Sequence, residues 1–177
     1  RGTAPMPELV RLVAAELVSE VCSVYVLRPG DILELAATEG LAAEAVGHTR
    51  LRVGEGIVGL AAATHQLLNL PDAQNHPGFA YRPETGEEPY SSMLAVPVRR
   101  AGRTLGVLAV QNRATRRYDA DEVEVVETVA MLLAELLAAG GSGPAEEGVA
   151  GTVPRRFTGT PLMAGLAIGP VLVSGPA

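Results

Sequence analysis

The stretch of the chain best suited to chemistry runs from Leu67 to Ser92, "LLNLPDAQNHPGFAYRPETGEEPYSS". It is polar and rich in proline, and it offers short hydrogen-bonding side chains on Asn69, Asp72, Ser91 and Ser92. A stretch this long without regular structure inside a compact domain is usually functional or mobile. These groups could bind a small molecule. The alternative interpretation is ordinary turn chemistry, because Asp and Asn side chains also stabilise turns.

A glycine-rich stretch, "LRVGEGIVGLAAATHQ", precedes this loop, and its Gly54, Gly56 and Gly59 match the pattern G-x-G-x-x-G. A dinucleotide site requires a hydrophobic strand before that pattern and a βαβ unit around it, and the sequence offers neither. We therefore interpret the glycines as a tight turn into a small helix from Ile57 to Thr64. Backbone N–H groups at the start of this helix, at Gly56 and Ile57, would suit a carboxylate.

Several kinds of chemistry are excluded by residue type. All 14 basic residues are arginine, which removes P-loop phosphate binding, Schiff-base formation and lysine general bases. Cys22 is the single cysteine, so an internal disulfide, a cysteine-based metal cluster and a two-thiol redox cycle are excluded, and we expect a buried, inert thiol. His76 has no partners at ligand spacing, so we expect no metal site.

Charge and hydropathy limit the classes of partner. The 14 basic and 20 acidic residues give a net charge of -6 and a pI near 5.1, which predicts no nucleic-acid binding. The longest apolar run, near Met131 to Ala139, is too short to span a membrane, and no signal-peptide pattern precedes the first helix. We expect a cytoplasmic protein without a membrane partner, whose 47% hydrophobic content is enough for a core.

The apolar periodicity predicts helices and hairpins. A first amphipathic helix is expected from Pro7 to Val21. Two hairpins follow the usual strand and turn patterns, with strands at 22–27 and 32–38 and at 92–98 and 104–112. Pro97 cannot donate to a ladder, so an edge or a bulge is expected there.

The last predicted helix begins near Tyr118, with Asp119 or Asp121 as its N-cap, and ends near Ala139. Its apolar stripe is broad enough to contact more than the domain's own sheet, either the first helix or a second copy of the chain. Residues 140–156 are rich in Gly, Pro and acid, which predicts a linker. The apolar residues 157–177 then look like the opening of a second domain.

The order of helix, hairpin, "LRVGEGIVG", "NLPDA", variable loop, "SMLAVPV", "LGVLAVQN" and "YDADEVEVVETVAMLLAEL" resembles a GAF domain, here at 7–139. The resemblance implies an α/β (α+β) fold. Its central antiparallel sheet carries the N- and C-terminal helices on one face and a loop with a short helix over the other.

The segment "GTPLMAGLAIGPVLV" resembles the first strand and turn of the phosphotransfer region of phosphoenolpyruvate-protein phosphotransferases. A GAF domain joined by a linker to that region is the arrangement of the nitrogen-related enzyme I family. None of the histidines lies in the family's G-G-x-x-S-H motif, and its phosphoenolpyruvate and magnesium site would lie downstream. The resemblance thus implies a non-catalytic fragment without a cofactor, in a parent enzyme that uses magnesium and phosphorylates an HPr-like phosphocarrier.

By the same resemblance, a ligand pocket is expected within residues 51–92 and one face of the sheet, with glutamine or a related metabolite as the ligand. The expected ligand-binding residues are Tyr25, Gly56, Ile57, Asn69, Asp72, Ala73, Ser91 and Ser92. The broad apolar stripe of the last helix leads us to expect a homodimer through the first and last helices.

Two alternatives stay open. One is a dimerisation or docking module whose pocket is collapsed. The other is an enzyme like the free methionine sulfoxide reductases, although Cys22 has no resolving thiol.

Overall fold

The computed structural model describes residues 5–141. The predicted opening of a phosphotransfer domain at 157–177, and all but the first two residues of the predicted linker, lie outside the described residues. Within residues 5–141, no helix combines the length and the apolar character needed to cross a membrane. The elements follow in the order α1 (Met6–Leu17), β1 (Val21–Arg28), β2 (Ile32–Glu39), η1 (Ala43–Ala45), β3 (Arg50–Arg52), α2 (Gly56–Thr64), β4 (Leu68–Leu70), η2 (Ala73–Asn75), η3 (Pro83–Thr85), β5 (Ser92–Arg100), β6 (Arg103–Asn112) and α3 (Ala120–Gly141).

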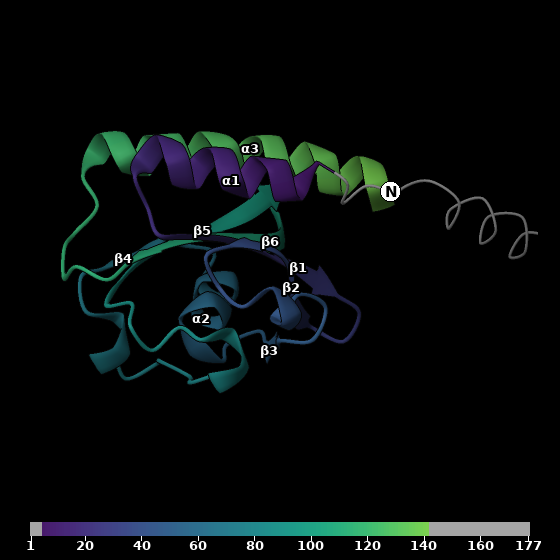
Figure 1. The fold of residues 1–177 in the computed structure, drawn as a ribbon. Helices are drawn as coiled ribbons and strands as arrows, with labels where there is room; N and C mark the ends of the chain where they lie inside the picture. Colours follow the sequence, from purple (N-terminus) through teal and green to yellow (C-terminus); the bar gives the residue numbers. More distant parts are fainter. Residues whose placement is uncertain (1–4, 142–177) are drawn as a thin grey trace, which may run out of the picture. The chain divides into compact units, whose positions relative to one another are not determined.

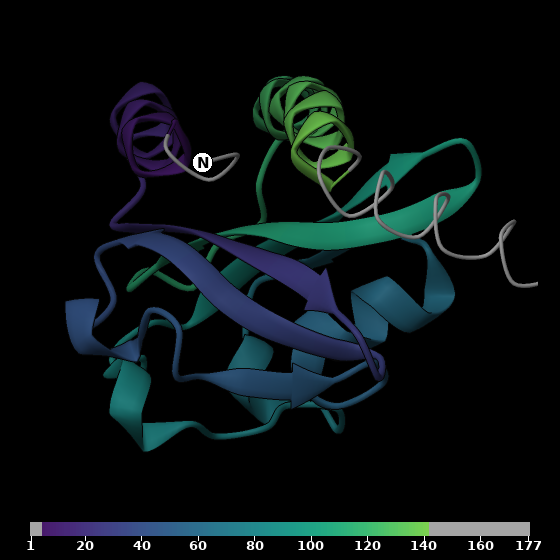
Figure 2. The same ribbon diagram turned by 90° about the vertical axis from the view of Figure 1, so that its right-hand side faces the viewer.

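The six strands form one antiparallel sheet in the order β3-β2-β1-β6-β5-β4. The two predicted hairpins, β1–β2 and β5–β6, meet where β1 pairs with β6 at the centre of the sheet. Helices α1 and α3 cover one face, and α2 with the long loops covers the other, as Figures 1 and 2 show. This arrangement confirms the predicted α+β fold with a helix pair on one face.

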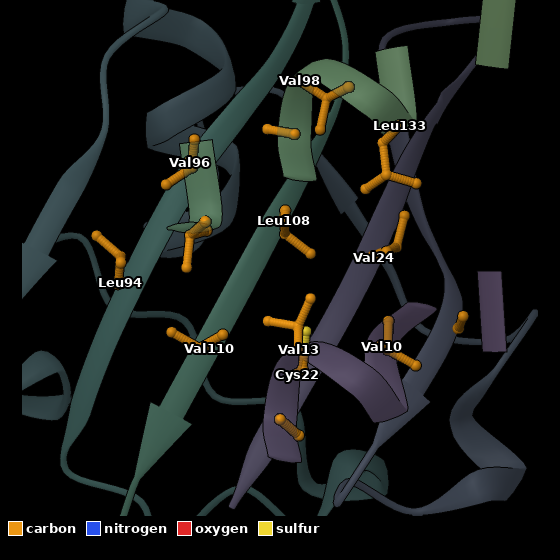
Figure 3. Close-up of a cluster of buried hydrophobic side chains, with 14 of the residues drawn as sticks. Val10, Val13, Cys22, Val24, Leu94, Val96, Val98, Leu108, Val110 and Leu133 are labelled. Carbon is orange, nitrogen blue, oxygen red and sulfur yellow. The ribbon is translucent and has the colours of Figure 1, made fainter. Parts of the chain in front are cut away.

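The central strands are buried on both faces, so alternate side chains enter different cores. On β5, Leu94, Val96 and Val98 pack under α1 and α3, and Figure 3 shows them in line with the side chains of β6 and β1. Met93 and Ala95 point to the opposite face and pack with α2. The parity of each strand residue therefore decides which of the two cores it joins.

Pro97 lies at a sheet edge, as expected. Strand β4 pairs with β5 only from Met93 to Ala95, so the rest of β5 has a neighbour on one side only. The register also shifts between Val98 and Arg99. Both features are typical surroundings for a proline in a strand.

Helix α1 is shorter than predicted, and Val21 belongs to β1 instead. The helix ends because Val18 adopts the left-handed conformation with φ of 52°, and the Ser19 N–H then donates to the carbonyl of Ala14. At the start of α3, Asp119 is the cap. Its carboxylate accepts from the Glu122 N–H at 2.9 Å, and the Glu122 carboxylate accepts from the Asp119 N–H at 2.8 Å.

Tyr118 fastens the start of α3 to the sheet. Its hydroxyl donates to Asn112 Oδ1 at 2.8 Å and lies 3.1 Å from the Ser92 hydroxyl. The Asn69 side chain binds the Tyr118 backbone twice, donating to its carbonyl at 2.8 Å and accepting from its N–H at 3.1 Å. Strands β4, β5 and β6 are thus joined to α3 by one buried polar cluster.

We predict that Tyr118→Phe lowers the free energy of unfolding by about 1–2 kcal/mol, because it leaves the buried Asn112 and Ser92 groups short of a partner. Urea denaturation measures the change. Tyr90→Phe is the matched control, since within residues 5–141 no hydrogen bond reaches the Tyr90 hydroxyl, and its cost should stay below about 0.5 kcal/mol. Equal costs for both variants would contradict the role given to the Tyr118 hydroxyl.

Candidate functional site

A small cavity lies on the α2 face of the sheet, under the loop that joins β4 to β5. Its volume is about 20 Å³, room for roughly one water molecule. The lining comes from β1, the segment around β3, the start of α2, the long loop and β5: Tyr25, Thr49, Leu51, Gly56, Ile57, Val58, Phe79, Ala80, Arg82, Thr85, Glu87 and Met93.

Glu87 places a carboxyl group in this enclosed site. The residue is only 7% exposed, and within residues 5–141 no hydrogen bond or ion pair reaches its carboxylate. Burial, with a smaller contribution from Glu88, raises the pKa of Glu87 to about 7, and Arg82 opposes this rise. The site therefore holds an acid that changes charge near neutral pH.

Tyr25 contributes a second buried polar group. It is 4% exposed, and no hydrogen bond to its hydroxyl exists among the described residues. Burial, and then the charges of Glu87 and Glu84, raise the pKa of Tyr25 well above its usual range. The phenol stays protonated, so it is a hydrogen-bond donor that faces the cavity.

Arg82 connects the long loop to the start of α2. Its guanidinium forms an ion pair with Glu55, and a second nitrogen donates to the carbonyl of Tyr81 at 3.2 Å. Glu55 also accepts from the Arg52 N–H at 3.0 Å, so the two hydrogen bonds lower the pKa of Glu55. The ion pair therefore joins the long loop to the residue that precedes α2.

Hydrogen bonds to its own backbone keep the long loop over the cavity. The Gln74 amide donates to the carbonyls of Glu88 and Tyr90 at 2.8 and 2.9 Å. The Thr85 carbonyl accepts from the Ala42 N–H at 2.9 Å, and the Thr85 hydroxyl donates to the Arg82 carbonyl at 2.7 Å. The loop also has apolar contacts with the domain, because Ala73 is buried in the α2 core and Phe79 and Ala80 pack against that core. Opening the loop would therefore break these contacts as well as the hydrogen bonds.

The glycine pattern has a structural cause. Gly56 has a φ of +74°, and a Cβ at Gly59 would lie 2.6 Å from the carbonyl oxygen of Arg52. Helix α2 carries no side-chain cap, and its first residues, Gly56 to Val58, line the cavity. Their N–H groups are the unsatisfied donors of a helix start and favour an anionic group nearby.

Three of the predicted site residues, Tyr25, Gly56 and Ile57, line the cavity. The structure places two others on the opposite face of the sheet by strand parity. Asn69 binds the backbone of Tyr118, and the Ser92 hydroxyl joins the polar cluster under α3.

The remaining three predicted residues lie in the loop but outside the cavity. Asp72 is exposed and accepts from the Asn75 side chain at 2.7 Å, which is the turn chemistry weighed for this segment. Ala73 is buried in the α2 core, and its N–H donates to the Ser91 carbonyl at 2.7 Å. These backbone bonds shape the loop.

Thr49, Arg82, Thr85 and Glu87 are cavity residues that the sequence reasoning missed. The motif "TGEEPY" contains two adjacent glutamates, of which one is buried and the other exposed, and the sequence does not distinguish them. The proline-rich composition around them was the available signal that this loop folds over a site.

Thiol chemistry is not available at the cavity. Cys22 lies in the core under α1 and α3, on the opposite face of the sheet from Tyr25. Burial, with the nearby charge of Glu39, raises the pKa of its thiol to about 12, so it is not a nucleophile. Among residues 5–141 no cluster of three potential metal ligands occurs.

Comparison with known proteins agrees with this geometry. Residues 6–137 match the GAF domain family. The chain belongs to the GAF domain family. GAF domains bind small molecules and serve as regulatory sensor domains, so this domain is not a catalytic one.

An Escherichia coli protein described as the phosphoenolpyruvate-dependent phosphotransferase system is 38% identical over 130 residues, which cover 73% of this chain and 17% of that protein. The Nif-specific regulatory protein of Azospirillum lipoferum is 32% identical over 106 residues, which cover 58% of this chain and 17% of that protein. The chain thus corresponds to about a sixth of the length of these relatives.

Among solved structures, the GAF domain of a phosphoenolpyruvate-protein phosphotransferase from Coxiella burnetii superimposes with a TM-score of 0.78 at 31% identity. The superposition covers 82% of this chain and 87% of that domain. The chain is therefore a GAF domain of the type found in phosphoenolpyruvate-protein phosphotransferases.

We predict that Glu87 makes stability depend on pH. Because its pKa rises from 4.5 to about 7 on folding, the native state holds a proton that the unfolded chain releases in this window. The free energy of unfolding should therefore fall by roughly 2 kcal/mol from about pH 5 to about pH 8, relative to Glu87→Gln. Urea denaturation at both pH values measures this difference. Exposed Glu44 supplies the control Glu44→Gln, which should follow the wild type.

Proposed function

We propose that this GAF domain is the sensor of a phosphoenolpyruvate-protein phosphotransferase of the nitrogen-related branch, and that it binds glutamine or a related metabolite in the cavity under the long loop. The observation that carries the proposal is the pair of polar residues, Tyr25 and Glu87, that line one cavity while their side-chain oxygens have no hydrogen-bond partner among residues 5–141. These oxygens keep contact with the accessible space of the cavity, so a ligand there could bind both.

Binding requires the loop to move, because about 20 Å³ is far below the several hundred Å³ typical of small-molecule pockets. The Arg82–Glu55 ion pair and the Gln74 bonds are the contacts that opening would exchange. A ligand that binds only the open state shifts the population toward it by its differential affinity.

A route from the loop to α3 supports signalling. The Ser91 N–H, at the end of the loop, donates to the Asn112 carbonyl at 2.9 Å, and the Asn112 side chain accepts from the Tyr118 hydroxyl. Movement of the loop would thus reach the residue that fixes the start of α3. Helix α3 leads toward residues 140–156, the proposed linker, and the proposed phosphotransfer domain at 157–177.

The proposal places the parent enzyme in the cytoplasm, with magnesium in its downstream catalytic site and an HPr-like phosphocarrier as its phosphate acceptor. The domain would adjust that phosphotransfer in response to nitrogen status. The similarity to the Nif-specific regulatory protein supports a link to nitrogen regulation.

Isothermal titration calorimetry of the folded chain tests the ligand. Glutamine should bind saturably. Glutamate tests the effect of a negative charge on the side chain, and 2-oxoglutarate tests the effect of losing the amino group. Absence of heat with all three and with a wider metabolite panel, together with no rise in melting temperature, would contradict the sensor proposal.

We predict that Tyr25→Phe lowers glutamine affinity by about tenfold, because the ligand loses one buried hydrogen bond. The free energy of unfolding should change by less than about 0.5 kcal/mol, since the phenol has no protein partner to lose. Tyr90→Phe, outside the cavity, is the affinity control and should leave binding unchanged.

The second candidate function is a dimerisation module with a closed cavity. It is favoured by the small cavity volume and by exposed apolar residues on the helix pair, with Leu12 of α1 62% exposed and Met131 and Leu132 of α3 63% and 57% exposed. Such side chains are usual at protein interfaces. A homodimer through α1 and α3 is compatible with both candidate functions.

We predict that the wild-type chain sediments as a dimer and that Leu132→Glu shifts it to the monomer, because a charge would be buried at the interface. Ala63→Glu, on the exposed side of α2 across the sheet, is the control and should not change the oligomeric state. A wild-type monomer at high concentration would overturn the homodimer.

A further inference from the structure

Glu87 is the charged group in the cavity that the protein leaves without a partner. Of the acidic side chains in this part of the loop, Glu84 accepts from the Thr49 hydroxyl at 3.0 Å and Glu88 binds the Tyr81 hydroxyl. The Glu87 carboxylate accepts no hydrogen bond within residues 5–141, although the residue is more than nine-tenths buried and lines the cavity. Its oxygens keep contact with the accessible space of the cavity and not with a protein donor, so they are available to a ligand.

The charged groups around Glu87 favour a positively charged ligand group at this carboxylate. The charged groups that act on it are Glu88 and Glu84, which are negative, and Arg82, whose guanidinium is committed to Glu55. Tyr25, from β1, faces the same space as a neutral donor. The balance of charge around this carboxyl is negative, and no histidine or further arginine lines the cavity.

Another part of the lining of the same cavity favours an anion. Gly56, Ile57 and Val58 line it at the uncapped start of α2, where helix N–H groups and the helix dipole stabilise negative charge. A cation-binding carboxyl and an anion-binding helix start therefore face one small space. This pairing matches a compact zwitterion.

Resting on the sensor function proposed above, we infer that the cavity selects an α-amino acid, with the Glu87 carboxylate binding the ligand's ammonium group and the start of α2 binding its carboxylate. Glu87 is then the residue that distinguishes an amino acid from the corresponding oxo acid or dicarboxylic acid. Tyr25 supplies the additional donor for a side-chain amide or carboxyl oxygen.

This arrangement links binding to a proton. Near neutral pH part of the free protein carries a protonated Glu87, and an ammonium ligand binds the ionised form. The carboxyl O–H bond breaks, the proton passes to solvent, and the carboxylate accepts a hydrogen bond from the ligand N–H. Binding therefore releases a fraction of one proton below about pH 7, and affinity rises with pH across that range.

Ligand analogues test the ammonium directly. L-Glutamine is compared with glutaramic acid, which is the same molecule without the α-ammonium, and with 2-oxoglutarate. Titration calorimetry in buffers of different ionisation enthalpy, at about pH 6.5, also counts the protons exchanged. We expect glutamine to bind at least about tenfold more tightly than glutaramic acid and to release protons.

Glu87→Gln provides the matched test in the protein. It should weaken glutamine binding by about tenfold or more, leave glutaramic acid binding unchanged or stronger, and abolish proton release. Glu44→Gln, at an exposed position outside the cavity, should behave as the wild type in all three measurements. At about pH 8 the Glu87→Gln variant should melt at a higher temperature than the wild type, because it has no mostly buried carboxyl to ionise. That result would show that the variant is folded.

The outcomes separate the two proposals. Saturable binding of 2-oxoglutarate or glutaramic acid, at least as tight as that of glutamine or accompanied by proton uptake, overturns the amino-acid inference and leaves the sensor function standing. Undiminished glutamine binding by Glu87→Gln overturns the role of Glu87. Failure of the L-amino acids and all other metabolites to bind overturns both proposals.

Discussion

The rest of the structure depends on one constraint, which is that the three central strands are buried on both faces. Side chains of β1, β5 and β6 alternate between a core under α1 and α3 and a core under α2. A shift of one residue in register would exchange the two sets of side chains. Leu94 and Ser92 would then face α2, and Met93 would face α1 and α3. Helix α2 contributes mainly alanine, glycine, isoleucine and valine to the core on the other face, and the cavity lies on that face.

The two faces of the sheet differ in how their buried polar groups are satisfied. Under α1 and α3, close packing and the Tyr118 cluster provide rigidity, because buried polar groups there are satisfied by protein partners. Under the loop, the side-chain oxygens of Glu87 and Tyr25 have no such partners among residues 5–141. The loop that covers them is held by hydrogen bonds, one ion pair and a few apolar contacts of Ala73, Phe79 and Ala80. A sensor needs this contrast, since a ligand changes the population of the less stable part while the rigid part carries the change to α3.

The charge pattern of the cavity gives the proposals their specificity. A mostly buried carboxyl and an uncapped helix start line the same cavity, so they offer one site for a cation and one for an anion. Phosphate-rich ligands fit poorly beside Glu87, Glu84 and Glu88, because these carboxyl groups repel further negative charge. This electrostatic limit is independent of the family resemblance.

The sequence by itself determined the main helices, their order and the two antiparallel hairpins, because these follow from periodicity and local backbone chemistry. It limited the cap of α3 to Asp119 or Asp121, and the order of its motifs indicated the GAF family by resemblance. It did not predict the short strands β3 and β4. Of the site residues that it predicted, Tyr25, Gly56 and Ile57 line the cavity. Only the tertiary structure decided which polar side chains face that cavity. Asn69 and Ser92 point the other way because of strand parity, and Asp72 completes a turn. Glu87 and Glu88 are neighbours with identical side chains, and the path of the loop over the sheet buries one and exposes the other. Burial is a property of the whole fold, so no local pattern distinguishes them.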